Sequence, residues 1–256
     1  MDLDGCVYRD YVPTEGAVEA LNRLRRLGVR VIYVTNNPET TSEELAERLH
    51  GLGVECSPED FITVGEAAAS YIYSRSGTSR VLVIAGDGVK KYCMRMGHRV
   101  LDMDEWDKAE YVVVGFDREI NYQKLVAGLR AILNGAIFIG TNPDAVHPGK
   151  NGLEPGSGAF VIMFEYMTGV KPIIVGKPSK IIMEQALKKL GMSPEEVLVV
   201  GDRVDTDVRA GKLVGADTAL ILTGITREKD LPNIPPELRP TYVFRNLREL
   251  VESLYT

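Results

Sequence analysis

Apolar residues recur along the chain in two alternating patterns. Segments such as residues 14–28 and 122–133 place apolar side chains three and four positions apart, which predicts amphipathic helices. Between such segments lie short, continuous apolar runs rich in β-branched residues, for example residues 29–34, 81–85 and 197–200. Runs of this kind are typical of parallel strands buried on both faces. The alternation therefore predicts an α/β fold with parallel sheets and right-handed crossovers.

The same pattern suggests that the chain is divided. Residues 74–79, SRSGTS, have the composition of a linker, and the strand–helix pattern restarts after them. We predict a core that begins with residues 1–77, a second α/β unit in residues 78–171, and a return to the core in residues 172–256.

Composition adds limits to this picture. The chain has 256 residues, of which 45% are hydrophobic and 26% charged, as in ordinary globular proteins. Its net charge of −6 gives no support for binding nucleic acid or an anionic membrane. The three cysteines lack C-x-x-C spacing, and no apolar run is long enough to span a bilayer. We therefore expect a cytoplasmic protein.

Four polar loops open the chain or follow predicted buried strands. They carry Asp2 and Asp4, Thr35, Lys177, and Asp202 with Asp207. Taken singly, a threonine can cap a turn, a lysine can be solvated and an aspartate can cap a helix. However, ligands of parallel sheets bind beyond the carboxyl ends of the strands, so four such loops together predict one site.

The residue types in these loops favour phosphoryl transfer. Carboxylates gathered in one place repel each other unless a hard cation lies among them, and oxygen ligands suit Mg²⁺. Magnesium and a lysine would neutralise a phosphoryl group during its transfer. One aspartate can attack phosphorus to give an aspartyl-phosphate, while a neighbouring carboxyl group handles the proton of the leaving group.

The motifs DLDGCVY, YVTNN, GKP and GDRVDTD, in this order, resemble the haloacid dehalogenase (HAD) superfamily, in its NagD / para-nitrophenylphosphatase branch. VVVGFDR, GTNPD and PGSGA in the middle of the chain are also similar to that branch. The resemblance implies a Rossmann-like parallel-sheet core with a smaller, inserted α/β cap of the C2 type. It also implies a magnesium-dependent phosphatase that hydrolyses small organic phosphate monoesters.

Residue by residue, the resemblance implies Asp2 as the nucleophile and Asp4 as the general acid/base. Thr35 and Lys177 would hold the transferring phosphoryl group. The implied magnesium ligands are Asp2, the backbone carbonyl of Asp4, Asp202, and Asp207 through a water.

Substrate contacts are expected from Asn36, which matches the TNN motif, and from Asn142, Asp144 and His147. For His147, a surface or helix-cap role is the competing interpretation. The cap would select the leaving group of a small phosphorylated metabolite, and similar proteins suggest a homodimer through the cap. Neither the physiological substrate nor the oligomeric state can be derived from the motifs.

The chain departs from the family at its start. In similar proteins a buried strand leads into the first aspartate, whereas here only Met1 precedes Asp2. We therefore expect the first core strand to be missing or truncated, with the α-amino group beside the nucleophile. Two explanations stay open: the natural start lies upstream, or the chain is a catalytically weak or inactive relic that binds phosphate or metal.

Two other classes fit less well. A nucleotide-dependent oxidoreductase would use Gly156 and Gly158, but no third glycine follows in register. A receiver-type signalling domain shares the acidic cluster, the threonine and the lysine, but is much shorter and has no insert.

Overall fold

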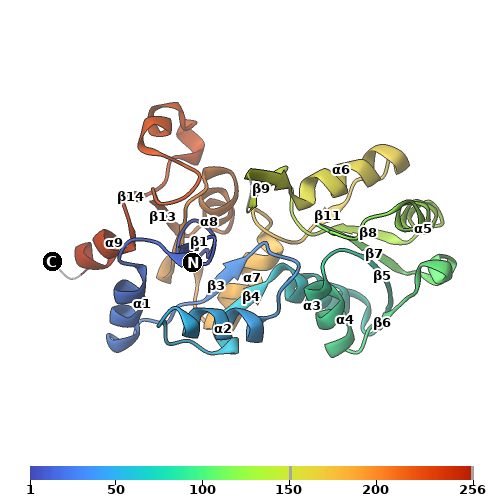
Figure 1. Cartoon of the computed structure of the whole chain (residues 1–256), viewed down its shortest axis with the longest axis horizontal. Coiled ribbons are helices and arrows are strands. Elements are labelled where there is room, and N and C mark those ends of the chain that lie inside the picture. The colour runs from blue at the N-terminus through green and yellow to red at the C-terminus, as the bar shows by residue number, and fades with distance from the viewer. Residues whose placement is uncertain (150–151, 255–256) are drawn as a thin grey trace. The chain divides into compact units, whose positions relative to one another are not determined.

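The computed structural model describes residues 1–149 and 152–254, which form two compact units. Unit 1 comprises Met1–Thr35, Ser42–Ile62 and Lys177–Thr256, and unit 2 comprises Asn36–Thr41 and Thr63–Gly176. Both units combine helices with parallel strands (Figure 1). The predicted α/β class is therefore confirmed.

Unit 1 contains a parallel three-stranded sheet in the order β12–β13–β14 and a separate pair, β3 with β4. The strands are β3 (Tyr33–Thr35), β4 (Phe61–Thr63), β12 (Leu198–Gly201), β13 (Asp217–Ile221) and β14 (Tyr242–Phe244). The short pair β1 (Tyr8–Arg9) and β2 (Val12–Pro13) forms an antiparallel hairpin near the start of the chain.

The helices of unit 1 are α1 (Ala17–Arg26), α2 (Ser42–Gly51), α7 (Lys180–Leu190), α8 (Arg209–Val214) and α9 (Leu247–Ser253). Helices α1, α2 and α9 turn their buried leucines toward the strands. In the resulting core, Leu21, Leu49 and Leu250 pack with Tyr33 and Phe61.

Met1 and Asp2 join the two groups of strands in unit 1. The Met1 amine donates to Ile32 O at 2.7 Å, Val34 N donates to Met1 O at 2.8 Å, and Asp2 N donates to Val200 O at 2.8 Å. Of the strand predicted over residues 29–34, only Tyr33 and Val34 lie in β3. No strand precedes Asp2 among the described residues. That the first strand of the family is truncated here stays a prediction.

Unit 2 contains a five-stranded parallel sheet in the order β11–β8–β7–β5–β6. Its strands are β5 (Arg80–Ile84), β6 (Arg99–Val100), β7 (Tyr111–Val114), β8 (Ile137–Gly140) and β11 (Ile173–Ile174). Helices α5 (Tyr122–Leu133) and α6 (Ser157–Thr168) cover one face, where Phe138 packs with Phe164. Figure 1 shows α3 (Val64–Ser76) and α4 (Asp87–Arg95) on the other face.

A hairpin of β9 (Val146–Gly149) and β10 (Gly152–Pro155) lies between β8 and α6 in the sequence. The sequence did not predict it, because the segment is rich in glycine and proline and has no alternating apolar pattern.

The boundaries between the units differ from those expected at 77/78 and 171/172. The chain instead passes between units at Ile62/Thr63 and Gly176/Lys177, and residues 36–41 also belong to unit 2. Helix α3 is part of unit 2 because it packs closely on α4: a Cβ at Gly65 would lie 3.1 Å from the backbone of Val89. The expected linker at residues 74–79 is the last turn of α3 followed by its Gly77 cap.

Candidate active site

The centre of the site is a buried lysine between two buried aspartates in unit 1. Lys177 Nζ donates to Asp2 Oδ1 at 2.5 Å and to Asp207 Oδ1 at 2.7 Å. The Lys177 and Asp207 residues are only 4% and 2% exposed. Lys177 of the GKP motif therefore contacts one aspartate of the DLDGCVY motif and one of the GDRVDTD motif.

Different elements bring these groups together. Asp2 is held beside β12 by the backbone bond to Val200, and Asp202 directly follows β12. Asp207 lies in the short π-helical turn η4 (Val204–Val208), where Arg203 N donates to its Oδ2 at 3.1 Å. Lys177 is the residue at which the chain enters unit 1 again.

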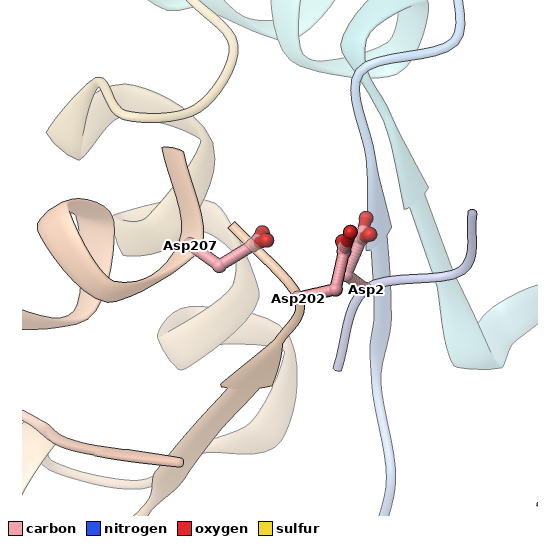
Figure 2. A group of neighbouring side chains, drawn as sticks. All are labelled: Asp2, Asp202 and Asp207. Atoms are coloured by element: carbon pink, nitrogen blue, oxygen red, sulfur yellow. The ribbon is translucent and has the colours of Figure 1, made fainter. Parts of the chain in front are cut away.

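The three aspartates can surround a cation. Asp2, Asp202 and Asp207 each offer a carboxylate oxygen within 4.8 Å of the other two (Figure 2). Asp202 Oδ2 accepts from Ile225 N at 2.6 Å, whereas Asp202 Oδ1 is buried and accepts no hydrogen bond from the residues that the structure describes. An orphaned carboxylate oxygen among other oxygen donors fits a hard divalent cation such as Mg²⁺.

Glycines allow Asp202 to lie at this place. A Cβ at Gly5 would lie 2.5 Å from Asp202 Oδ2, and Gly5 has a φ of +88°. Gly224 approaches the same carboxylate even more closely from the loop after β13. The glycine of the D-x-D-G motif therefore serves both the turn and the close packing against Asp202.

The charges of the cluster shift one another. Burial by itself lowers the pKa of Lys177, but the carboxylates of Asp2 and Asp207 outweigh it and keep the pKa above its usual range. Burial raises the pKa of Asp2, and Lys177 opposes this rise. Burial, followed by the charges of Asp2 and Asp207, raises the pKa of Asp202 well above 3.8. The cluster thus holds more carboxylates than one lysine can balance.

Asp4 differs from the other aspartates because it is accessible to solvent. Exposure to solvent by itself would leave the pKa of Asp4 near its ordinary value. The protein around Asp4 nevertheless removes part of its hydration and raises its pKa to about 7; Asp2 adds to the rise and Arg48 opposes it. The nearby negative charge of Asp2 supports this direction. A carboxyl group of this kind can both give and take a proton near neutral pH.

Thr35 is buried at the end of β3, next to the segment that carries Asp2. The Met1 amine lies beside the same strand, and burial, followed by the charge of Lys177, lowers its pKa to about 6. Burial and Lys177 thus both oppose a positive charge at this position.

Three of the predicted substrate residues meet in unit 2. Asp144 Oδ2 accepts from Asn36 Nδ2 at 2.9 Å and from Asn142 Nδ2 at 2.5 Å. His147 lies apart from them: its Nε2 is 3.5 Å from Glu154 Oε2 on the opposite strand of the β9–β10 hairpin, and its ring stands edge-on to Phe116. The assignment of Asn36, Asn142, Asp144 and His147 as substrate contacts stays a prediction.

Comparison with known proteins identifies the family of this chain. A model of haloacid dehalogenase-like hydrolases matches residues 1–99, and a HAD-hydrolase-like model matches residues 174–250. The acid sugar phosphatase of Staphylococcus aureus is 37% identical over 254 residues, covering 99% of this chain and 96% of that protein. The chain belongs to the haloacid dehalogenase-like hydrolases.

Solved HAD structures agree. The p-nitrophenyl phosphatase from Archaeoglobus fulgidus has a TM-score of 0.92 and 37% identity, covering 98% of this chain and 97% of that one. A glycerol phosphate phosphatase from Mycobacterium tuberculosis in complex with magnesium has a TM-score of 0.90 and 32% identity, covering 97% and 74%. The expected NagD / para-nitrophenylphosphatase branch and the expected enzyme class, a HAD-type phosphoric monoester hydrolase, are thereby confirmed.

Sequence reasoning missed two residues of this HAD site. Arg48, on α2, lies close enough to Asp4 to oppose the rise of its pKa, and no local motif marks it. Gly224 packs against Asp202 from a loop whose sequence gives no signal of that contact.

Among the described residues, no helix has the length and apolar character needed to cross a membrane.

Proposed function

We propose that the chain is a magnesium-dependent phosphatase that hydrolyses small organic phosphate monoesters through an aspartyl-phosphate on Asp2. The observation that carries this proposal is the buried cluster of Asp2, Lys177 and Asp207, beside which Asp202 Oδ1 accepts no hydrogen bond from the part of the chain that the structure describes. The cluster provides a nucleophile, a fixed cation and a place for a second cation, which are the parts that phosphoryl transfer needs.

In the proposed reaction, an Asp2 carboxylate oxygen attacks phosphorus, and the bond between phosphorus and the ester oxygen breaks. The protonated Asp4 carboxyl group gives its proton to the departing oxygen, which leaves as an alcohol. The Asp4 carboxylate then takes a proton from a water that attacks the phosphorus of the aspartyl-phosphate. Inorganic phosphate leaves, and the Asp2 carboxylate and the Asp4 proton are restored.

The other groups stabilise charge during both steps. Lys177, kept cationic by Asp2 and Asp207, lies where it can bind an oxygen of the transferring group. Thr35 offers a hydroxyl group to the same phosphoryl group. Mg²⁺, held by Asp2, the Asp4 carbonyl group, Asp202 and Asp207, would supply further positive charge against the phosphoryl oxygens.

The named relatives support the substrate class. They include an acid sugar phosphatase, a p-nitrophenyl phosphatase and a glycerol phosphate phosphatase. We infer that the substrates of this chain are phosphate esters of small metabolites such as sugars and polyols, and that p-nitrophenyl phosphate serves as a surrogate.

The test is hydrolysis of p-nitrophenyl phosphate and a sugar phosphate with Mg²⁺ and with a chelator. The chain should release phosphate only with Mg²⁺, and Asp2→Asn should reduce turnover by several orders of magnitude. Asp217→Asn is the matched control, because it makes the same change at an exposed carboxylate of unit 1.

Phosphate release that persists in Asp2→Asn or under chelation would contradict the mechanism. Binding of Mg²⁺ or phosphate by a folded chain without any turnover would favour the inactive relic instead.

A further inference from the structure

The chain enters and leaves unit 2 next to two residues of the proposed phosphate site. The chain changes units four times: the first change falls between Thr35 and Asn36, and the last falls between Gly176 and Lys177. The first residues on the unit 2 side, Asn36 and Gly176, are therefore bonded directly to Thr35 and Lys177. Any shift of Asn36 or Gly176 moves its neighbour's backbone.

One loop of unit 2 holds both of these residues. The loop follows β8, and its Asp144 accepts the Asn36 amide at 2.9 Å. At its other end, Thr141 O accepts from Gly176 N at 2.6 Å. Asn142, which is 3% exposed, donates to the same Asp144 oxygen and fixes that carboxylate within the loop.

Asn36 and Gly176 also contact each other. A Cβ at Gly176 would lie 2.6 Å from Thr141 O and 2.7 Å from Asn36 Oδ1. The Asn36 side chain therefore fills the space between Asp144 and the backbone of Gly176. Glycine is required at position 176 because any side chain would displace one of these two neighbours.

The rest of the segment 36–41 is fixed to unit 2 as well. Gly88 N donates to Glu39 O at 3.0 Å, and the Arg118 side chain pairs with the Glu39 carboxylate at 3.1 Å. These bonds hold the segment within unit 2 beyond Asn36.

We propose that Asn36, Thr141, Asn142, Asp144 and Gly176 form a clasp that sets the spacing of Thr35 and Lys177. Within this clasp, Asn36 and Asp144 are positioning residues: they act on the phosphoryl group through their neighbours and do not touch the substrate. The inference rests on the proposed function, because Thr35 and Lys177 bind the phosphoryl group only in that function.

The clasp and a substrate-binding role predict different kinetics. A loosened clasp misplaces Thr35 and Lys177 for every phosphate ester, so Asp144→Ala should lower kcat by roughly tenfold to a hundredfold on both p-nitrophenyl phosphate and a sugar phosphate. A substrate contact would instead raise KM for the sugar phosphate and leave p-nitrophenyl phosphate unchanged. That outcome would overturn the proposal. Asp104→Ala, at an exposed carboxylate of the same unit, is the control.

A reciprocal exchange tests the central hydrogen bond. Asn36→Asp alone places two carboxylates against each other and should lower kcat strongly. Asp144→Asn in the same protein restores a donor and an acceptor with their direction reversed, once the Asn142 amide turns over. The double variant should regain at least part of the lost kcat. A double variant no better than Asn36→Asp would contradict the clasp.

Amide hydrogen exchange separates the clasp from the activity itself. In Asp144→Ala the Gly176 amide, which donates to Thr141 O, should exchange faster, while amides of β5 keep their protection. This result is expected even if the chain hydrolyses no phosphate ester, in which case only the proposed function fails. Unchanged exchange at Gly176 would overturn the clasp whatever the activity.

Discussion

The two polar clusters of this protein use buried carboxylates in opposite ways. In unit 1, Asp2 and Asp207 share one lysine, and Asp202 beside them keeps an oxygen without a partner among the described residues. In unit 2, Asp144 accepts two amide groups through a single oxygen. The first cluster holds excess negative charge and calls for a cation, whereas the second is bound together by hydrogen bonds. The first therefore suits phosphoryl transfer, and the second suits holding neighbouring backbone segments in place.

We expect the largest effect from removing the lysine of the unit 1 cluster. Lys177→Met leaves two buried carboxylates without their partner, and breaking a buried pair in this way costs about 3–5 kcal/mol. We therefore expect a fall of this size in the free energy of unfolding, measured by urea denaturation, and loss of phosphatase activity. Lys212→Met changes an exposed lysine of unit 1 and is the control. An unfolding free energy equal to that of the parent would show that the two buried carboxylates do not need Lys177 as a partner.

Asp202→Asn should separate metal binding from stability. The folded-state pKa of Asp202 lies above its ordinary value of 3.8, so without metal this group favours the fold below pH 3.8, and this contribution is lost as the pH rises through the raised pKa. Near neutral pH the metal-free variant should therefore unfold at the same or a higher temperature than the parent.

The same variant should lose most of the thermal stabilisation that Mg²⁺ gives the parent. The measurement is a pair of thermal unfolding curves with and without Mg²⁺, with Asp217→Asn at an exposed strand end as control. Equal stabilisation of the variant and the parent by Mg²⁺ would exclude Asp202 as a ligand.

The smallest effect is expected in unit 2. Gly176→Ala forces a methyl group against Thr141 O and Asn36, and overpacking of this kind costs about 1–3 kcal/mol. Gly51→Ala adds the same methyl group where no atom lies within 4 Å. Thermal unfolding should show a loss in the first variant and none in the second. A Gly176→Ala variant as stable as the parent would mean that the contact with Asn36 is loose.

The sequence predicted the chemical residues of unit 1 better than their supports. Asp202 stands just after a short apolar run, at the kind of strand end where ligands of parallel sheets bind. Lys177 also follows such a run, but that run is β11 of the unit 2 sheet, so its place beside Asp2 depends on the return of the chain to unit 1. The closeness of Gly224 to Asp202 depends on packing between distant loops, which no local pattern encodes.

The division of the chain was harder to predict. Thr35 and Asn36 belong to one motif but to different units, because only tertiary contacts decide that Asn36 bonds with Asp144. Similarly, residues 74–79 have the composition of a linker, yet they end a helix that packs on α4. The β9–β10 hairpin has no apolar alternation, so its pairing could not be derived from periodicity.

The central claim is that Asp2 carries the phosphoryl group, and the most direct test is to isolate that intermediate. The chain would be mixed with Mg²⁺ and p-nitrophenyl phosphate, quenched in acid during turnover, and digested for mass spectrometry. We predict a phosphate on the peptide containing Asp2, labile to hydroxylamine and absent in Asp2→Asn. Turnover without any phosphorylated carboxylate in that peptide, or the same modification in Asp2→Asn, would contradict the account.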